Sequence, residues 1–192
     1  MPRPTSRRTA VLLVITVCML AVGAAPASAA PTLDAIAVGD SVMLGARWTL
    51  RDKGIEEIDA KVSRQATTGP GLLRERGDSL PQHVVVHLGS NGTYTLDMCK
   101  ELVRTAGPER TVYLVTVKVP RPWEARNNAM LATCARRFAE GRVVLVDWHG
   151  LATRRPELLY ADGVHLRPDG AAAFARMIAR AIREASTPGR ES

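Results

Sequence analysis

Short apolar runs alternate with longer amphipathic stretches along the chain. Five of the apolar runs predict strands, at residues 35–38, 55–62, 84–88, 111–117 and 143–146. The run 84–88 is rich in β-branched residues, which suits a strand buried on both faces of a parallel sheet. Apolar residues at helical spacing predict helices over 42–50, 72–76, 96–106, 124–140 and about 168–185. We therefore expect one α/β domain, a three-layer α/β/α sandwich around a five-stranded parallel sheet.

The first 29 residues follow a different pattern. Arg3, Arg7 and Arg8 precede an apolar run at 10–22, and a segment of small residues ends at Ala29. This arrangement is typical of a secretory signal peptide cleaved near Ala29, with an uncleaved N-terminal anchor as the alternative. We expect residues 30–192 to form a single domain that is secreted, either extracellular or associated with the cell wall. The sequence leaves open whether export follows the general or the twin-arginine route.

Charge and cysteine content narrow the class of protein. The 192 residues carry 26 Lys and Arg against 19 Asp and Glu, and the net charge falls from +7 to +4 without the leader, which has three arginines and no acidic residue. The basic residues form no cluster, so nucleic-acid binding has no support. The sequence contains no CxxC or HExxH motif, so it does not suggest a metal site. Outside the cytoplasm Cys99 and Cys134 can form a disulfide; the alternative is two buried thiols on separate helices.

Three segments at or near the expected carboxyl edge of the sheet carry candidate chemistry. Ser41 directly follows the first strand and begins a helix, where backbone N–H groups stabilise negative charge, although a serine there is often only a helix cap. Asp162 and His165 are spaced so that the carboxylate can orient an imidazole toward a serine; a solvated Asp beside a half-buried His is the plainer alternative. Asn91 follows the strand 84–88 and is either an oxyanion donor or a turn residue.

Together these segments resemble the SGNH (GDSL-type) hydrolase superfamily. The resemblance rests on AVGDSV at 37–42, HLGSNG at 87–92 and DGVHL at 162–166, and it covers nearly all of residues 30–192. The chain is most similar to the extracytoplasmic SGNH domains that accompany multi-span membrane acyltransferases, including peptidoglycan O-acetyltransferases. Segments 63–65, 120–123 and 146–148 carry that closer likeness. The implied fold is the flavodoxin-like sandwich of these hydrolases.

The resemblance also implies roles for individual residues. Ser41 is the expected nucleophile, His165 its general base and Asp162 the residue that orients the base. The Asn91 side chain and the backbone amides of Ser41 and Arg64 are the expected oxyanion-hole donors, with Arg64 where the superfamily usually has glycine. Gly92 stands where the third block often has Asp, which favours the acyltransferase-like branch.

The implied function is that of a secreted serine esterase or O-acyltransferase. It would act through a Ser41 acyl-enzyme on short-chain, chiefly acetyl, esters of carbohydrate or cell-wall glycan, with no metal or organic cofactor. A general carboxylesterase or lipase, and a non-catalytic glycan-binding module, are the alternatives. The sequence leaves no length for a multi-span membrane domain, so we expect the acyl group to come from a small ester or from a membrane acyltransferase partner. We expect the protein to be a monomer.

Other residues have two possible uses. Trp123 and Trp148 follow the fourth and fifth strands and either line a sugar-binding rim or pack in the interior. Trp48 is expected in the core, as is His87 on the central strand, and Asp147 is expected to cap the helix after the fifth strand.

Overall fold

Five parallel strands form the centre of the molecule. The computed structural model describes residues 31–138 and 142–187. The strands are β1 (Ala35–Gly39), β2 (Glu57–Ala60), β3 (His83–His87), β4 (Thr111–Val115) and β5 (Val143–Val146). They lie in the order β2-β1-β3-β4-β5, and every neighbouring pair is parallel. The predicted five-stranded parallel sheet is therefore confirmed.

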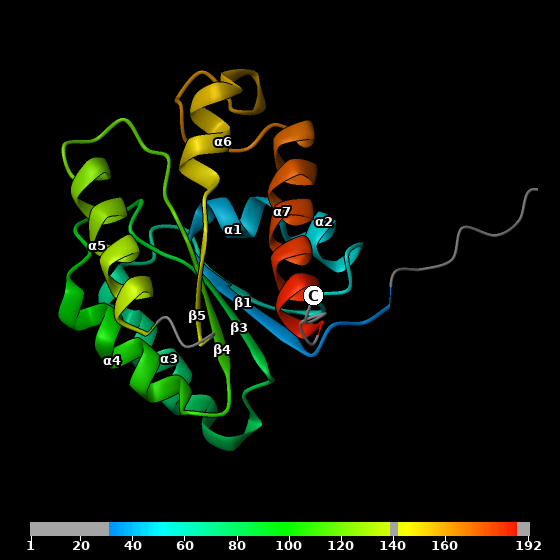
Figure 1. Cartoon of the computed structure of the whole chain (residues 1–192). Coiled ribbons are helices and arrows are strands. Elements are labelled where there is room, and N and C mark those ends of the chain that lie inside the picture. Colours follow the sequence, from blue (N-terminus) through cyan, green and yellow to red (C-terminus); the bar gives the residue numbers. More distant parts are fainter. Residues whose placement is uncertain (1–30, 139–141, 188–192) are drawn as a thin grey trace, which may run out of the picture.

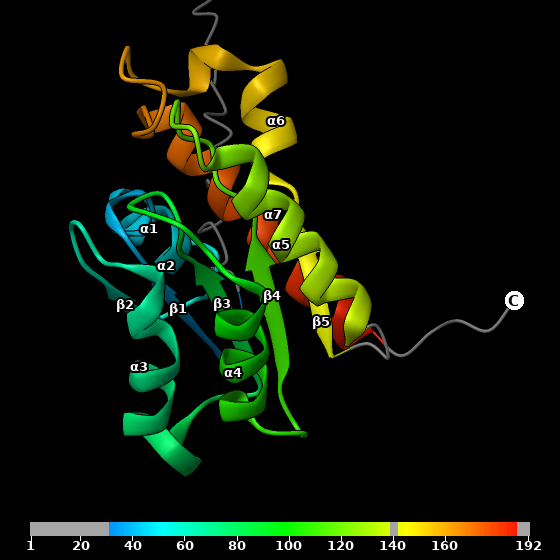
Figure 2. The same ribbon diagram turned by 90° about the vertical axis from the view of Figure 1, so that its left-hand side faces the viewer.

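Helices cover both faces of the sheet, as Figures 1 and 2 show. One face packs against α3 (Gly69–Arg76), α4 (Leu96–Ala106) and α5 (Glu124–Arg137). The other face packs against α1 (Ser41–Gly45), α2 (Arg47–Arg51), α6 (Trp148–Arg154) and α7 (Pro168–Ser186). Three short 3-10 turns, at Ala66–Thr68, Gly77–Ser79 and Pro156–Leu158, complete the connections.

Alternate strand residues fill two separate cores. On β1, Ile36 and Val38 are buried toward α3 and α4, whereas Ala35 and Ala37 are buried toward α7. Successive strand side chains point to opposite faces, so a run of consecutive apolar residues supplies both cores at once. This is why the apolar runs in the sequence mark the strands so clearly.

The structure differs from the sequence prediction in its details. The expected helix 42–50 is two short helices that meet at Ala46, whose backbone lies at φ −91° and ψ 1°, outside helical geometry. The second strand is shorter than 55–62, and α5 ends at Arg137. The signal-peptide prediction concerns residues outside the described part of the chain. Within residues 31–138 and 142–187, no helix is long and apolar enough to cross a membrane.

A disulfide joins α4 and α5. The sulfur atoms of Cys99 and Cys134 are bonded, which ties together two neighbouring helices on the same face of the sheet. Both cysteines are fully buried in the core under these helices.

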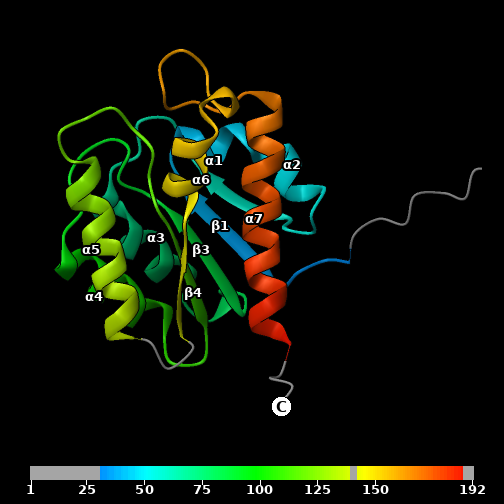
Figure 3. The same ribbon diagram turned by 45° about the horizontal axis from the view of Figure 1, so that its top comes forward.

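The sheet has a topological switch point between β1 and β3. From β1 the chain continues to β2 on one side, whereas β3, β4 and β5 follow one another on the other side. In open parallel sheets the crevice beyond the carboxyl ends of two such strands is the usual ligand site. The segments after β1 and β3 therefore lie where a site is expected, at the end of the sheet near α1, α6 and the start of α7 (Figure 3).

Candidate active site

Ser41 occupies a sharp turn from β1 into α1. The Asp40 side chain caps this helix by accepting a hydrogen bond from the Val42 N–H at 3.0 Å. Only glycine fits at position 39, because a Cβ atom there would lie 2.3 Å from the Met43 Cβ. Ser41 is the first residue of α1, so its own N–H has no acceptor within the helix. The turn thus presents both the hydroxyl and the amide of Ser41 at the carboxyl edge of the sheet.

A buried carboxylate–imidazole pair, Asp40 and His87, lies next to this turn. The His87 Nδ1 lies 3.2 Å from the Asp40 Oδ1, and both side chains are fully buried. Burial opposes ionisation of Asp40, but the attraction of His87 and the hydrogen bonds from His87 and the Val42 N–H outweigh it and hold the pKa of Asp40 below its usual value. His87 is a core residue, as the sequence predicted, and its contact is with the cap of the helix that carries Ser41.

His165 and Asp162 reach Ser41 from the loop before α7. The Ser41 Oγ lies 3.0 Å from the His165 Nε2, and the His165 Nδ1 lies 2.7 Å from the Asp162 Oδ2. Ser41, His165 and Asp162 therefore form a continuous line of hydrogen bonds, although Ser41 is far from the other two in the sequence. Side chains of Asp162 and His165 are about half exposed, so the line opens to solvent.

The environment of Asp162 determines the tautomer of His165. Slight burial opposes ionisation, but hydrogen bonds from the His165 ring and from the backbone N–H groups of Val164 and His165 lower the pKa of Asp162 to about 2. An ionised carboxylate only accepts hydrogen bonds, so the proton of the neutral imidazole lies on Nδ1. The Nε2 atom is then free to accept the proton of the Ser41 hydroxyl.

The loop that carries His165 is held by its own backbone. Leu159 and Leu166 form an antiparallel bridge, and the Tyr160 N–H donates to the His165 carbonyl at 2.9 Å. Gly163 turns the chain at φ +70°, a left-handed conformation that favours glycine. Because Leu159 and Leu166 are buried, the loop is anchored in the core although its tip is exposed.

A pocket of about 370 Å³ opens beside the Ser41 hydroxyl. Predicted site residues Ser41, His165, Asn91 and Trp123 all line it. Its wall also contains residues that the sequence analysis did not single out: Ser63, Gln65, Ser90, Val119, Arg121 and Val164. Most of these belong to the motif segments 63–65, 87–92, 120–123 and 162–166, and that adjacency is the signal that could have found them.

The backbone N–H of Arg64, predicted as an oxyanion-hole donor, makes a hydrogen bond within its own loop. It donates to the Lys61 carbonyl at 3.3 Å, and Arg64 does not line the pocket, although Ser63 and Gln65 on either side do. The guanidinium instead bonds the Asp59 carboxylate at 2.7 Å and the Gly39 carbonyl at 3.3 Å. Arg64 therefore braces the end of β2 against the end of β1, next to the turn that holds Ser41.

The structure decides between the two alternatives for Trp148 and differs from the expectation for Trp48. Trp148 does not belong to the rim: it is fully buried, and its ring packs edge-on against Phe174 with 5.2 Å between ring centroids. Trp48, expected in the core, is 58% exposed, with the guanidinium groups of Arg47 and Arg51 each 5.0 Å from its ring centroid. Trp48 lies on α2, the second of the two short helices.

Asp147 has the structural use that the sequence predicted. Its side chain caps α6 by accepting from the Gly150 N–H at 2.9 Å. In the described part of the chain, no group of three or more His, Cys, Asp or Glu residues is placed to hold a metal ion.

Comparison with known proteins agrees with this geometry. The chain is 37% identical to YrhL of Bacillus subtilis over 153 residues and 33% identical to the O-acetyltransferase OatA of Staphylococcus aureus over 155 residues, in each case 78% of the chain. The C-terminal catalytic domain of the Streptococcus pneumoniae peptidoglycan O-acetyltransferase OatA superposes with a TM-score of 0.70 at 25% identity, covering 82% of this chain and 96% of that domain. The chain belongs to the SGNH hydrolase superfamily.

The likeness concerns one domain of longer proteins. This SGNH chain spans about a quarter of the length of YrhL and of the staphylococcal OatA, 24% and 25% respectively. None of the protein-family models matches the chain. Within the superfamily its homologues are O-acetyltransferases, as its motif segments predicted.

Proposed function

We propose that this SGNH protein is an exported serine O-acyltransferase or esterase that acts on acetyl and other short-chain esters of carbohydrate or cell-wall glycan. The observation that carries the proposal is the line from the Ser41 Oγ through the His165 imidazole to the Asp162 carboxylate, with steps of 3.0 and 2.7 Å, at the wall of a pocket. The assignment of an acetyl group and a cell-wall glycan rests on the names of the relatives, which are O-acetyltransferases, one of them of peptidoglycan.

The first half-reaction forms an acyl-enzyme. The His165 Nε2 accepts the proton of the Ser41 hydroxyl as Oγ attacks the ester carbonyl. Asp162 stabilises the imidazolium that forms. His165 then returns the proton to the departing alcohol oxygen, and the acyl group stays on Ser41.

The second half-reaction removes the acyl group. His165 takes a proton from the incoming nucleophile, whose oxygen attacks the acyl carbonyl, and the proton returns to Ser41 Oγ as the ester bond to the enzyme breaks. Water as nucleophile gives free acid, and a sugar hydroxyl gives an acylated sugar. The two activities therefore share all of these residues and differ only in the acceptor.

Two donors are available for the developing oxyanion. One is the Ser41 N–H at the start of α1. The other is the Asn91 Nδ2, which lies 3.4 Å from the Arg64 carbonyl, and Asn91 lines the pocket. A contact of that length is weak, so the amide can turn toward an oxyanion at little cost.

The test is a comparison of Ser41→Ala with Ser79→Ala, a surface serine whose hydroxyl bonds the Arg76 carbonyl. We expect acetate release from p-nitrophenyl acetate to fall on the order of 10³-fold in Ser41→Ala and to stay unchanged in Ser79→Ala. Mass spectrometry of quenched wild type should find one acetyl group on the peptide that contains Ser41. Equal rates for wild type and Ser41→Ala would refute the assignment.

Hydrolysis and transfer are separated by the product. With a soluble glycan oligomer added as acceptor, an acylated sugar shows transfer, and free acid alone shows an esterase. The sequence relatives support transfer.

Export is part of the proposal. The Cys99–Cys134 disulfide supports it, because structural disulfides are typical of oxidising compartments outside the cytoplasm. We propose that residues 1–29 direct the protein through the membrane and are removed, and that the mature monomer receives acyl groups from a small ester or from a membrane acyltransferase. N-terminal sequencing of the protein from culture medium or cell wall should begin at residue 30.

A further inference from the structure

The pocket beside Ser41 contains one permanently charged side chain. Apart from His165, its wall is made of hydroxyl, amide, apolar and aromatic residues, and Arg121 is the exception. Arg121 is exposed, and no ion pair or side-chain hydrogen bond involves it within residues 31–138 and 142–187. Its guanidinium is therefore available to whatever occupies the pocket.

The neighbouring cations are already neutralised. The Arg64 guanidinium is 2.7 Å from the Asp59 carboxylate, and the Lys118 Nζ is 3.2 Å from the Glu124 Oε1. Partial burial opposes ionisation of Glu124, but hydrogen bonds from the Val119 N–H, Lys118 and His149 hold its pKa below the usual value, so its charge is present to offset Lys118. Arg121 therefore differs from both in lining the pocket with no acidic partner among the described residues.

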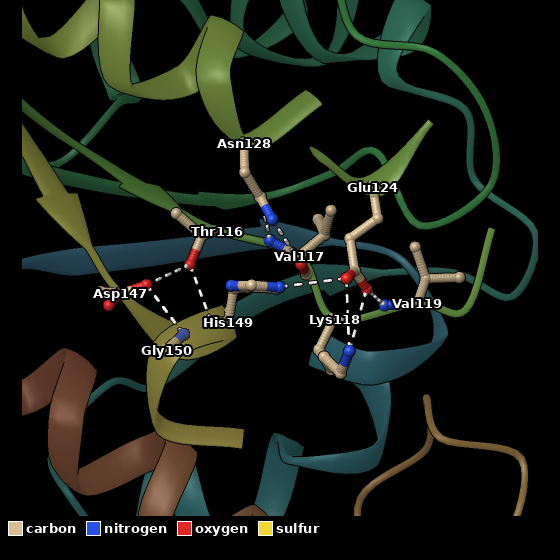
Figure 4. Close-up of polar contacts among 9 residues, drawn as sticks. All are labelled: Thr116, Val117, Lys118, Val119, Glu124, Asn128, Asp147, His149 and Gly150. Atoms are coloured by element: carbon tan, nitrogen blue, oxygen red, sulfur yellow. Dashed lines mark hydrogen bonds and ion pairs between the residues drawn. The ribbon is translucent and has the colours of Figure 1, made fainter. Parts of the chain in front are cut away.

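Glu124 also fixes the loop on which Arg121 stands. The Glu124 carboxylate accepts hydrogen bonds from the Val119 N–H and the Lys118 Nζ of the loop. It also lies 3.0 Å from the His149 Nε2 of α6, as Figure 4 shows. Asn128 adds two hydrogen bonds to the backbone of Val117, at 2.8 Å to its N–H and 2.9 Å to its carbonyl (Figure 4). The segment 117–124 is thus joined to both α5 and α6.

The backbone of Arg121 is held within that segment. Its N–H donates to the Val119 carbonyl at 2.7 Å, and its carbonyl accepts from the Glu124 N–H at 3.1 Å. Trp123, two residues later, lines the same pocket. A cation on a fixed backbone costs little ordering free energy when a ligand binds, because only its side chain must be immobilised.

We infer that Arg121 binds an anionic group, a carboxylate or a phosphate, carried by the glycan close to the hydroxyl whose ester reacts at Ser41. The planar guanidinium donates two parallel hydrogen bonds to either oxyacid. A glycan with such a group is oriented by the ion pair, whereas a neutral sugar lacks that anchor. The inference rests on the proposed function, since it names the class of glycan that the same pocket selects.

The experiment measures binding without turnover. Calorimetric titration of the Ser41→Ala protein with methyl glucoside, glucuronate and glucose 6-phosphate compares a neutral sugar with a carboxylate and a phosphate. We expect at least one anionic sugar to bind about fivefold more tightly than methyl glucoside. A preference for glucuronate identifies an acidic sugar as the source of the anion, and a preference for glucose 6-phosphate identifies a phosphorylated glycan. The preference should shrink as salt is raised.

Arginine variants in the same background show which residue is responsible. Arg121→Gln should bring the ratio of the dissociation constants close to one, and Arg121→Lys should keep part of the preference because the charge remains. The matched control is Arg126→Gln, since Arg126 is an exposed arginine of α5 that does not line the pocket. Equal binding of neutral and anionic sugars, or a preference that survives in Arg121→Gln, would overturn the inference.

The two proposals fail in different measurements. Loss of the charge preference leaves the Ser41-dependent release of acetate untouched. Absence of that release refutes the catalytic assignment but does not alter the binding ratios.

Discussion

Replacing Asp162 with Asn changes the hydrogen bonding of His165 while keeping the shape of the loop. In the native protein the Asp162 Oδ2 accepts from the His165 Nδ1 at 2.7 Å, and its Oδ1 accepts from the Val164 and His165 N–H groups. An Asn side chain can keep the two backbone hydrogen bonds through its carbonyl oxygen. Its NH2 group then faces the His165 Nδ1 and favours the tautomer with the proton on Nε2, which cannot accept the proton of the Ser41 hydroxyl.

The expected effects on stability and on activity differ in size. A lowering of the Asp162 pKa from 3.8 to about 2 corresponds to at most about 2.4 kcal/mol of stability at neutral pH. The side chain is 48% exposed, so solvent screening reduces this to about 1 kcal/mol or less. Loss of the correct tautomer costs on the order of 10³- to 10⁴-fold in kcat/KM, or about 4 to 5.5 kcal/mol in the barrier.

The pH dependence of stability provides an independent check. Because the pKa of Asp162 is lowered on folding, its stabilising contribution is fully present above about pH 4 and is lost as the pH falls through about 2. The unfolding free energies of wild type and Asp162→Asn should therefore differ near neutral pH and converge toward pH 2. Urea titrations at several pH values measure this directly.

The assay is Ser41-dependent ester hydrolysis, with Asp97→Asn as the matched control. Asp97 also forms an i,i+3 ion pair, with the Lys100 Nζ 2.9 Å away, but it lies on α4 outside the pocket. We expect Asp97→Asn to keep wild-type kcat/KM. If Asp162→Asn folds normally and loses less than tenfold in kcat/KM, the role given to Asp162 is wrong.

Three further predictions concern residues that support the site. Cys99→Ser removes the disulfide between α4 and α5, whose two cysteines are 35 residues apart in the sequence. We expect the unfolding free energy, measured by chemical denaturation, to fall by about 3 to 4 kcal/mol, and an unchanged midpoint would contradict this. His87→Ala leaves the buried Asp40 carboxylate without its imidazole partner and should cost about 3 kcal/mol by the same method, whereas retained stability would mean that the pair is dispensable. Trp148→Ala should lower the unfolding free energy by about 3 to 5 kcal/mol because the ring is fully buried. Trp123→Ala should change KM for glycan esters more than it changes stability, because Trp123 lines the pocket. A larger effect of Trp148→Ala on KM than on stability would instead place Trp148 on the rim.

Features of the fold that depend on local pattern could be predicted from the sequence. The strands are recognisable because buried parallel strands need apolar residues on both faces, as in Val84 and Val85, which point into opposite cores. The break at Ala46 could not be predicted, because Ala is a good helix former.

The active site, too, has features that the sequence predicts and features that depend on tertiary contacts. Asp162 and His165 are three residues apart on one loop, so their contact is a local property that spacing can indicate. Their meeting with Ser41 follows from a topological rule about the carboxyl ends of parallel strands. Burial of Trp148 depends on Phe174 in α7, and the attachment of Arg121 to a fixed loop depends on Glu124, Asn128 and α6, which no spacing in the sequence reveals.

The segment 63–65 shows why matching motif letters does not fix the position of a backbone amide. The superfamily usually has a glycine in its second block, and matching motif letters placed Arg64 at that position. In the structure the left-handed backbone, which glycine adopts at no steric cost, occurs one residue earlier, at Ser63 with φ +59°. Because backbone conformation determines where an amide points, Ser63, which lines the pocket, is the position in this segment where a glycine-like backbone occurs. Arg64 does not line the pocket, and its guanidinium bonds the Asp59 carboxylate and the Gly39 carbonyl.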